Sequence, residues 1–160
     1  MSQNDWQSNR PLVIDTNTVL SALVGGTTRR LLFELNRNRC YPEPSLDEIN
    51  RNRGVIQERA GLSATAIDEL LERLFNQITV VPEATVVREF ETAAQATSPH
   101  PDANPDHQFI DRDKGDVVFL ATALAVNGDI WSDDSVFKHQ GLVHWYRTQD
   151  VVEHTGVGDE

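Results

Sequence analysis

The sequence contains a single cysteine, very little lysine and no long hydrophobic run. With Cys40 alone, no disulfide can form within the chain, which is typical of a reducing compartment such as the cytoplasm. No apolar stretch approaches the ~18 residues of a membrane span, and residues 1–10 lack the apolar core of a signal peptide. We therefore expect a cytoplasmic protein that has no membrane partner.

Positive charge is scarce and unevenly distributed. The 160 residues carry 25 Asp and Glu against 14 Lys and Arg, a formal net charge of −11, and only Lys114 and Lys138 are lysines. Residues 1–60 contain seven acids and eight arginines, whereas residues 61–160 contain eighteen acids and six basic residues. This balance excludes a protein that binds nucleic acid through bulk positive charge. It also suggests a high-salt cytoplasm, where salt would screen the self-repulsion.

Short apolar runs alternate with amphipathic segments. The predicted strands are residues 12–14, 40–41, 78–81, 130–132 and 142–146, and the predicted helices are residues 28–38, 63–76, 83–96 and 116–126, with a further helix that starts at Ser45. Residues 97–113 are rich in proline and acid and are expected to form a loop. The alternation predicts a parallel α/β sheet with helices on both faces. We expect one domain over residues 11–150, with flexible tails at 1–10 and 151–160.

Acidic residues follow the predicted strands or open the predicted helices. They are Asp15, Glu48, Asp116 and the adjacent Asp133 and Asp134. Ligands of such sheets bind beyond the carboxyl ends of the strands, where the strand order reverses. We therefore expect these carboxylates to gather at one edge of the sheet.

Each acid also has a structural interpretation. Asp15 is a candidate helix cap, and Ser45 with Glu48 matches a capping box. Asp116 suits the first turn of a helix, for which Asp113 is the candidate cap. Of Asp133 and Asp134, one is expected to cap the next segment and the other to bind a metal.

The chemistry of the acids as a group favours a metal site. The sequence has no glycine-rich phosphate loop, no recognisable Ser-His-Asp arrangement and no cysteine pair. All-oxygen ligands suit Mg²⁺ or Mn²⁺ rather than zinc. Clustered carboxylates that hold one or two such ions are typical of phosphodiester hydrolysis.

Several segments together resemble a known family. They are VIDTN at 13–17, SLDEI at 45–49, DKGDVVFLATALAVNGDIWSDD at 113–134 and the strand at 142–146. The chain resembles PIN-domain ribonucleases, including VapC-like toxins, over roughly residues 11–148. The resemblance implies a three-layer α/β/α sandwich with a mainly parallel sheet of about five strands. It also implies an acidic pocket that binds one or two Mg²⁺ or Mn²⁺ ions and cleaves single-stranded or loop RNA.

The resemblance assigns roles to individual residues. The catalytic and metal-binding acids are Asp15, Glu48, Asp116 and Asp134, supported by Asn17, Ser132, Asp133 and Asp113. Which member of the pair Asp133 and Asp134 binds metal is left open. Arginines from the first half are the candidate contacts to RNA phosphates, namely Arg29, Arg30, Arg51 and Arg53. The resemblance further suggests an antitoxin partner and a homodimer.

Two other functions start from the same residues. An inactive PIN-like module that binds RNA or protein would keep the fold without the reaction. A phosphatase of the haloacid-dehalogenase type would use Asp15 as nucleophile, but it needs a second acid where this chain has Asn17. A receiver-like domain would need an acidic pair earlier in the chain, and none precedes Leu12.

Overall fold

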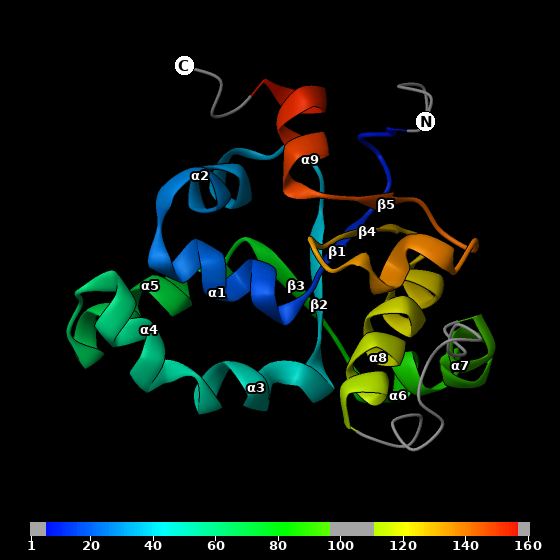
Figure 1. Ribbon diagram of the computed structural model, residues 1–160, viewed down its shortest axis with the longest axis horizontal. Helices are drawn as coiled ribbons and strands as arrows, with labels where there is room; N and C mark the ends of the chain where they lie inside the picture. The colour runs from blue at the N-terminus through cyan, green and yellow to red at the C-terminus, as the bar shows by residue number, and fades with distance from the viewer. Residues whose placement is uncertain (1–5, 97–110, 157–160) are drawn as a thin grey trace.

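A five-stranded parallel sheet forms the centre of the structure (Figure 1), a computed structural model in which residues 6–96 and 111–156 are described. Its strands are β1 (Leu12–Ile14), β2 (Arg39–Pro42), β3 (Ile78–Val81), β4 (Asp129–Trp131) and β5 (Trp145–Tyr146). They lie in the order β3-β2-β1-β4-β5, and every neighbouring pair is parallel. β1 is wholly apolar and fully buried, as expected for a central strand. The strand order reverses at β1, which places the predicted ligand crevice between β1 and β4.

Helices cover both faces of the sheet. One layer contains α1 (Thr16–Val24), α2 (Gly26–Glu34), α3 (Leu46–Arg51), α4 (Arg53–Ala60) and α5 (Ala64–Phe75). The opposite layer contains α6 (Glu83–Val87), α7 (Phe90–Ala96) and α8 (Asp111–Val126), and Figure 1 shows α1, α2, α4 and α5 to the left and α6 to α8 to the right. Right-handed crossovers require this division, because the chain moves one way along the sheet from β1 to β3 and returns to β4. The predicted three-layer α/β/α fold is confirmed.

The helix that precedes β4 is longer than predicted. α8 begins at Asp111, whereas the sequence pattern predicted residues 116–126. Asp111 and Asp113 are residue types that favour a first helical turn, since the helix N-terminus is the positive end of the dipole. Most of the predicted loop at 97–113 lies outside the described residues, and its last three residues are helical.

The prediction of one continuous helix over residues 83–96 is also wrong. The structure has two short helices, α6 and α7, with a turn at Arg88 and Glu89 between them. Val86 and Ala93 are buried as predicted, but Val87 is 59% exposed. The Thr85-Val86-Val87 run is β-branched, which disfavours an uninterrupted helix.

The end of the chain departs from expectation in two ways. The predicted strand 142–146 is reduced to β5, because the Gln140 side chain accepts hydrogen bonds from the backbone N–H groups of Leu142 and Val143 and closes that segment as a turn. Residues 152–155, expected to be frayed, belong to helix α9 (Thr148–Thr155), in which Val151 is fully buried.

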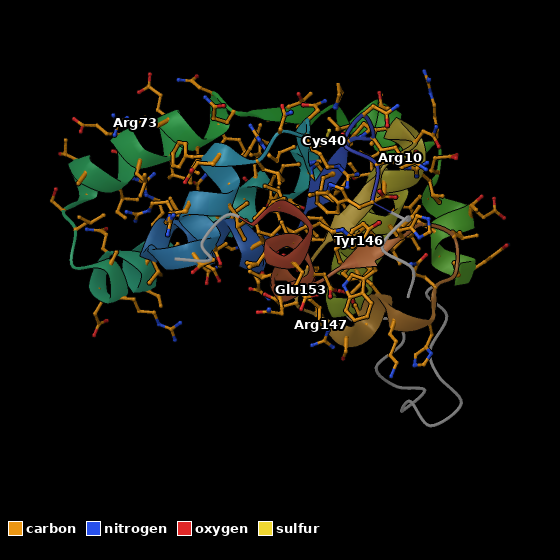
Figure 2. All side chains as sticks on the ribbon, turned by 90° about the horizontal axis from the view of Figure 1, so that it is seen from above. Arg10, Cys40, Arg73, Tyr146, Arg147 and Glu153 are labelled. Carbon is orange, nitrogen blue, oxygen red and sulfur yellow. The ribbon has the colours of Figure 1, made fainter. Side chains whose placement is uncertain are left out.

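Parts of both expected tails pack on the domain. The Trp6 ring stacks on His154 with centroids 4.9 Å apart and meets Tyr146 edge-on at 5.0 Å. Figure 2 shows Arg10 and Tyr146 in the same part of the molecule. Trp6 and His154 therefore pack on the domain, while the domain boundaries and the flexible tails stay predictions.

The turn from α8 into β4 depends on a glycine. Asn127 has a positive φ of 56°, and the Gly128 N–H donates to the Ala123 carbonyl at 2.8 Å, as in a Schellman motif. A Cβ at Gly128 would lie 2.5 Å from the Pro11 carbonyl oxygen, so no side chain fits. This close approach lets Asp129 pair with the start of β1. In the described part of the chain, no helix has the length and apolarity to cross a bilayer.

Candidate active site

Asp15 lies where the central strand ends. Asp15 is the N-cap residue of α1 and has an extended backbone. Its carboxylate Oδ1 accepts hydrogen bonds from the Thr18 backbone N–H at 2.8 Å and from the Thr18 hydroxyl at 2.6 Å. Asp15 is only 5% exposed. The apolar strand therefore delivers a nearly buried carboxylate, and the first turn of α1 sets its orientation.

The end of β4 completes the contact with Asp15. Ser132 is fully buried and donates its hydroxyl to Asp15 Oδ2. The backbone N–H of Asp134 donates in turn to the Ser132 hydroxyl oxygen at 3.0 Å. These bonds join the ends of β1 and β4 in the crevice where the strand order reverses. Ser132 thus contacts the acid it was predicted to support.

The adjacent acids Asp133 and Asp134 have different partners. Both carboxylate oxygens of Asp133 accept hydrogen bonds at 2.8 Å from Thr148, one from its N–H and one from its hydroxyl. Asp134 Oδ1 caps the short 3-10 helix η4 (Ser135–His139) by accepting from the Val136 N–H at 3.0 Å, and Oδ2 has no hydrogen bond to the described residues. Asp134 is therefore the freer of the two carboxylates.

Glu48 approaches the site from the helix that follows β2. It lies half-buried in the first turn of α3, while Asp47 is exposed. The predicted capping box is wrong, because the Ser45 side chain forms no capping hydrogen bond. Ser45 instead ends a 3-10 turn, η2 (Glu43–Ser45), and its carbonyl accepts the Tyr41 hydroxyl proton at 2.8 Å. The Glu48 carboxylate is thus not used to cap its own helix.

Thr16 and Tyr41 are polar residues of this region that the sequence analysis missed. The two hydroxyl oxygens lie 2.8 Å apart, and both residues are buried. Either hydroxyl can be the donor in this bond, because Tyr41 also reaches the Ser45 carbonyl and Thr16 also bonds to the Glu48 carboxylate. Thr16 was visible in the VIDTN motif, but nothing in the sequence pairs it with a tyrosine twenty-five positions later.

Asp116 is carried by the helix on the other face of the sheet. It lies in the second turn of α8 and is partly exposed. Phe119, three residues on and on the same helix face, has its ring centroid 5.9 Å from that of Tyr41. Asp116 therefore lies on the face of α8 that meets Tyr41. Asp113, the predicted cap, lies inside the helix, and its side chain is outside the described residues.

The electrostatics of these acids reflect burial and mutual repulsion. Burial raises the pKa of Asp15 above its ordinary value, the hydrogen bonds from Ser132 and Thr18 lower it, and the Asp134 charge raises it again. Burial likewise raises the pKa of Glu48, where Arg51 and Thr16 oppose the shift and Asp15 adds to it. Asp15 therefore lies within electrostatic reach of both Glu48 and Asp134. A bound cation would relieve both repulsions.

The donor set suits a hard divalent ion, although the acids do not form a finished coordination sphere. The side chains that bond to Asp15 are the hydroxyls of Thr18 and Ser132, and in the described part of the chain no cysteine or histidine joins them. Within the described residues, no three acidic, histidine or cysteine side chains converge closely enough to hold a metal by themselves. Waters and substrate oxygens would therefore supply part of the coordination, as Mg²⁺ commonly requires.

The predicted phosphate-binding arginines are mostly occupied elsewhere. Arg29 donates from Nε to the Ala22 carbonyl at 2.8 Å and from Nη2 to the Leu23 carbonyl at 2.7 Å, so it caps α1. Arg53 is paired with Asp68, and Arg30 lies 3.7 Å from Glu34. Arg51 interacts electrostatically with Glu48 and opposes the rise in the pKa of that carboxyl group.

Asn17 lines a small cavity beside the acids. This cavity, of about 230 Å³, is lined by Asn17, Thr18, Ser21, Asp133 and Asp134. Asn17 is exposed, and no hydrogen bond of its side chain occurs among the described residues. Asn17 forms no hydrogen bond to Asp15 among the described residues, and its supporting role at the site stays a prediction.

The comparison with known families agrees with this geometry. The family model of the PIN domain matches residues 13–154, which include strands β2 to β5, β1 from its second residue on, and each candidate site acid. A search of curated proteins finds no match. The match covers most of the chain, and the sheet order and the acids at the carboxyl ends of β1 and β4 follow from the same residues. The chain therefore belongs to the PIN-domain family, whose members are generally nucleases.

Proposed function

We propose that this protein is a metal-dependent endoribonuclease that hydrolyses RNA phosphodiester bonds. The observation that carries the proposal is the nearly buried Asp15 carboxylate, held by Ser132 and Thr18 and facing the charges of Asp134 and Glu48. Burying repelling carboxylates costs free energy that capping a helix does not require. A role in binding one or two Mg²⁺ or Mn²⁺ ions accounts for the arrangement.

In this proposal the four acids hold the ions and the neighbouring hydroxyls orient them. The acids are Asp15, Glu48, Asp116 and Asp134. Such ions, when bound, activate water and neutralise the charge that develops on the phosphate. Ser132 and Thr18 keep both oxygens of Asp15 in fixed directions, and Thr16 steadies Glu48. Asp133 serves the site indirectly, because its bonds to Thr148 hold the loop after β4 against α9.

The decisive experiment compares cleavage of a pool of cellular RNAs by the wild type and by Asp116→Asn in the presence of Mn²⁺. We expect cleavage by the wild type, inhibition by EDTA, and a loss of about a hundredfold or more in Asp116→Asn, since removing one charge-stabilising group commonly costs this much. Circular dichroism checks that the variant is folded.

Asp47→Asn is the matched control for this test. Asp47 is exposed and adjacent to Glu48 on α3. The substitution removes the same charge as Asp116→Asn, so the cleavage rate of this variant should equal that of the wild type. Cleavage that persists in Asp116→Asn would contradict the assignment. Binding of RNA without any cleavage by the wild type would favour the inactive-module alternative.

The VapC-like subtype, an antitoxin partner, a homodimer and a cytoplasmic location are further predictions of this proposal. A small reading frame immediately upstream, whose product binds this chain and blocks cleavage, would support the toxin assignment. The phosphatase alternative predicts an aspartyl-phosphate at Asp15, which mass spectrometry of the protein after incubation with a phosphate ester would detect.

A further inference from the structure

A second and larger cavity adjoins the acids along α1. It has a volume of about 550 Å³ and is lined by residues of α1, of α4 and of the junctions beside them: Asn17, Leu20, Ser21, Val24, Gly25, Asn52, Val55, Ile56 and Arg59. α1 and α4 contact each other directly and lie together on one side of the sheet (Figure 1). The role assigned to the acids does not use this cavity.

The larger cavity shares two lining residues with the smaller cavity beside the acids. Asn17 and Ser21 line both this cavity and the smaller one that reaches Asp133 and Asp134. Asn17, Ser21 and Val24 are spaced four and three residues apart and lie on one face of α1. At a rise of 1.5 Å per residue, that face runs for about 10 Å away from the acids. A ligand bound at the acids would therefore extend along α1 into the larger cavity.

The lining combines apolar walls with amide edges. Val24 and Val55 are 41% and 51% exposed and present apolar surface to the cavity. Asn52 donates from Nδ2 to the Glu48 carbonyl at 2.7 Å, and its Oδ1 has no hydrogen bond within the described residues. A flat heterocycle with polar edges matches this lining, since its faces contact the valines and its edge bonds to the amides of Asn17 and Asn52.

Arg59 supplies a positive charge that the fold does not use. It is exposed at the last turn of α4, and the described residues offer it neither an ion pair nor a hydrogen bond. It lines the larger cavity and not the smaller one. Arg29 and Arg53 are engaged with a helix end and an acid, whereas the Arg59 guanidinium is available for a phosphate.

We propose that the cavity between α1 and α4 is a nucleotide subsite of the nuclease. One nucleotide of single-stranded RNA, next to the bond held at the acids, places its base against Val24 and Val55 and its outer phosphate on Arg59. The inference rests on the proposed function and adds the place that holds one nucleotide beside the cleaved bond. That nucleotide must be unpaired, because a base paired in a duplex cannot enter a pocket of this kind.

The first test measures whether one base of the substrate is read. After the cleavage position in a single-stranded RNA is mapped, abasic residues replace the bases on either side of it one at a time. In the wild type, one such replacement should lower kcat/KM about tenfold, the scale of a single base contact. In Val55→Trp, which fills the cavity, the intact and abasic RNAs should be cleaved at equal rates.

Charge is tested separately with a matched pair of exposed arginines. Arg59→Gln should raise KM about tenfold with little change in kcat. Arg73→Gln removes the same charge from α5, where Figure 2 shows Arg73 at one end of the molecule, and it should leave KM unchanged. Both positions are exposed, so neither substitution is expected to unfold the chain.

Binding measured without turnover separates this inference from the proposed function. In the Asp116→Asn background with Mg²⁺, the anisotropy of a fluorescein-labelled single-stranded RNA should show tenfold weaker binding in Arg59→Gln and Val55→Trp but not in Arg73→Gln. If these two variants bind RNA more weakly but the wild type does not cleave it, the subsite is supported and the proposed nuclease activity is contradicted. Cleavage with all variants alike would keep the nuclease and overturn the subsite. The subsite is also overturned if Val55→Trp changes only the association of the chain with itself or another protein.

Discussion

At the scale of single residues, the Asp15 carboxylate lies at the end of a buried strand, and each of its oxygens accepts a hydrogen bond from a hydroxyl group. Asp15 was predictable because a carboxylate directly after a buried apolar strand must lie at the sheet edge. Thr16 and Tyr41 were not, because their contact joins the start of α1 to β2, which are far apart in the sequence. The choice between Asp133 and Asp134 also needed coordinates, since only the position of Thr148 shows that Asp133 is occupied.

Asp15 should make the metal-free protein less stable as the pH rises. Burial raises its folded-state pKa, so the folded chain retains a proton that the unfolded chain loses above its ordinary pKa of 3.8. Stability is therefore lost as the pH rises from this value through the folded pKa. Asp15→Asn should raise the melting temperature in EDTA at neutral pH, by about 2–4 °C for each kcal/mol recovered in a chain of this size.

Thermal melts of both proteins in EDTA from pH 4 to pH 8 test this prediction. The difference between the two melting temperatures should grow with pH, and Mg²⁺ should reduce it by stabilising the wild type alone. A lower melting temperature for Asp15→Asn at every pH would show that the carboxylate is mainly a structural cap.

At the scale of elements, local pattern predicted where most helices and strands lie but not all their ends. The helix over 63–76 is confirmed as α5, with Ser63 as its cap, because its apolar spacing and its cap agree. At Ser45 the local signal failed, since the Tyr41 hydroxyl takes the Ser45 carbonyl and a 3-10 turn precedes the helix. Gln140 similarly shortens β5 by bonding the backbone that a strand would have used.

Arg29 was predicted to bind RNA, but its side chain bonds to the end of a helix instead. Its guanidinium bonds two carbonyls at the end of α1, where cations are favourable. Arg29→Ala should lower the free energy of unfolding by roughly 1–2 kcal/mol, since hydrogen bonds from a charged group carry about this much. Urea denaturation measures the change.

Arg30→Ala is the natural comparison. Arg30 pairs with Glu34 on the exposed face of α2, an interaction worth only about 0.3–0.5 kcal/mol. If both variants lost the same stability, or if Arg29→Ala weakened RNA cleavage while remaining as stable as the wild type, the capping role would be wrong.

At the scale of the whole molecule, buried acids have different partners at the two ends of the parallel strands. At the carboxyl ends of the strands, Asp15 faces other carboxylates. At the other edge, Asp129 is fully buried but paired, with Arg37 at 2.8 Å and Arg10 at 3.1 Å. Trp6 covers Arg37 at 4.3 Å from the ring centroid, which ties the N-terminal segment to this pair.

Asp129→Asn should therefore be strongly destabilising, in contrast to Asp15→Asn. Removing one partner of a buried ion pair leaves the other charge uncompensated and typically costs about 3–5 kcal/mol. The loss should appear in urea denaturation at neutral pH. A cost below that of Arg29→Ala would mean that the Arg37–Asp129 pair contributes little to the fold.

The net charge of −11 concerns the molecule as a whole. Self-repulsion among unpaired surface acids is long-ranged and is screened by salt. The melting temperature should rise by several degrees as KCl is raised from low to molar concentration, given that each kcal/mol corresponds to about 2–4 °C. Sodium sulfate would stabilise any protein, so KCl is the salt to use. A melting temperature that does not change with KCl would remove the high-salt hypothesis.

The sequence by itself determined the layer architecture, the family and the edge of the sheet where the acids meet, because these follow from periodicity along the chain and from the direction of parallel strands. Only the tertiary structure decided which polar groups are already occupied. Arg29, Asp133 and Ser45 are each bound by a partner that the local pattern does not show, whereas Asp134 Oδ2, Asn52 Oδ1 and Arg59 have no such partner among the described residues. A polar group that bonds to one partner is not available to another, and which partner lies within bonding distance depends on the tertiary structure.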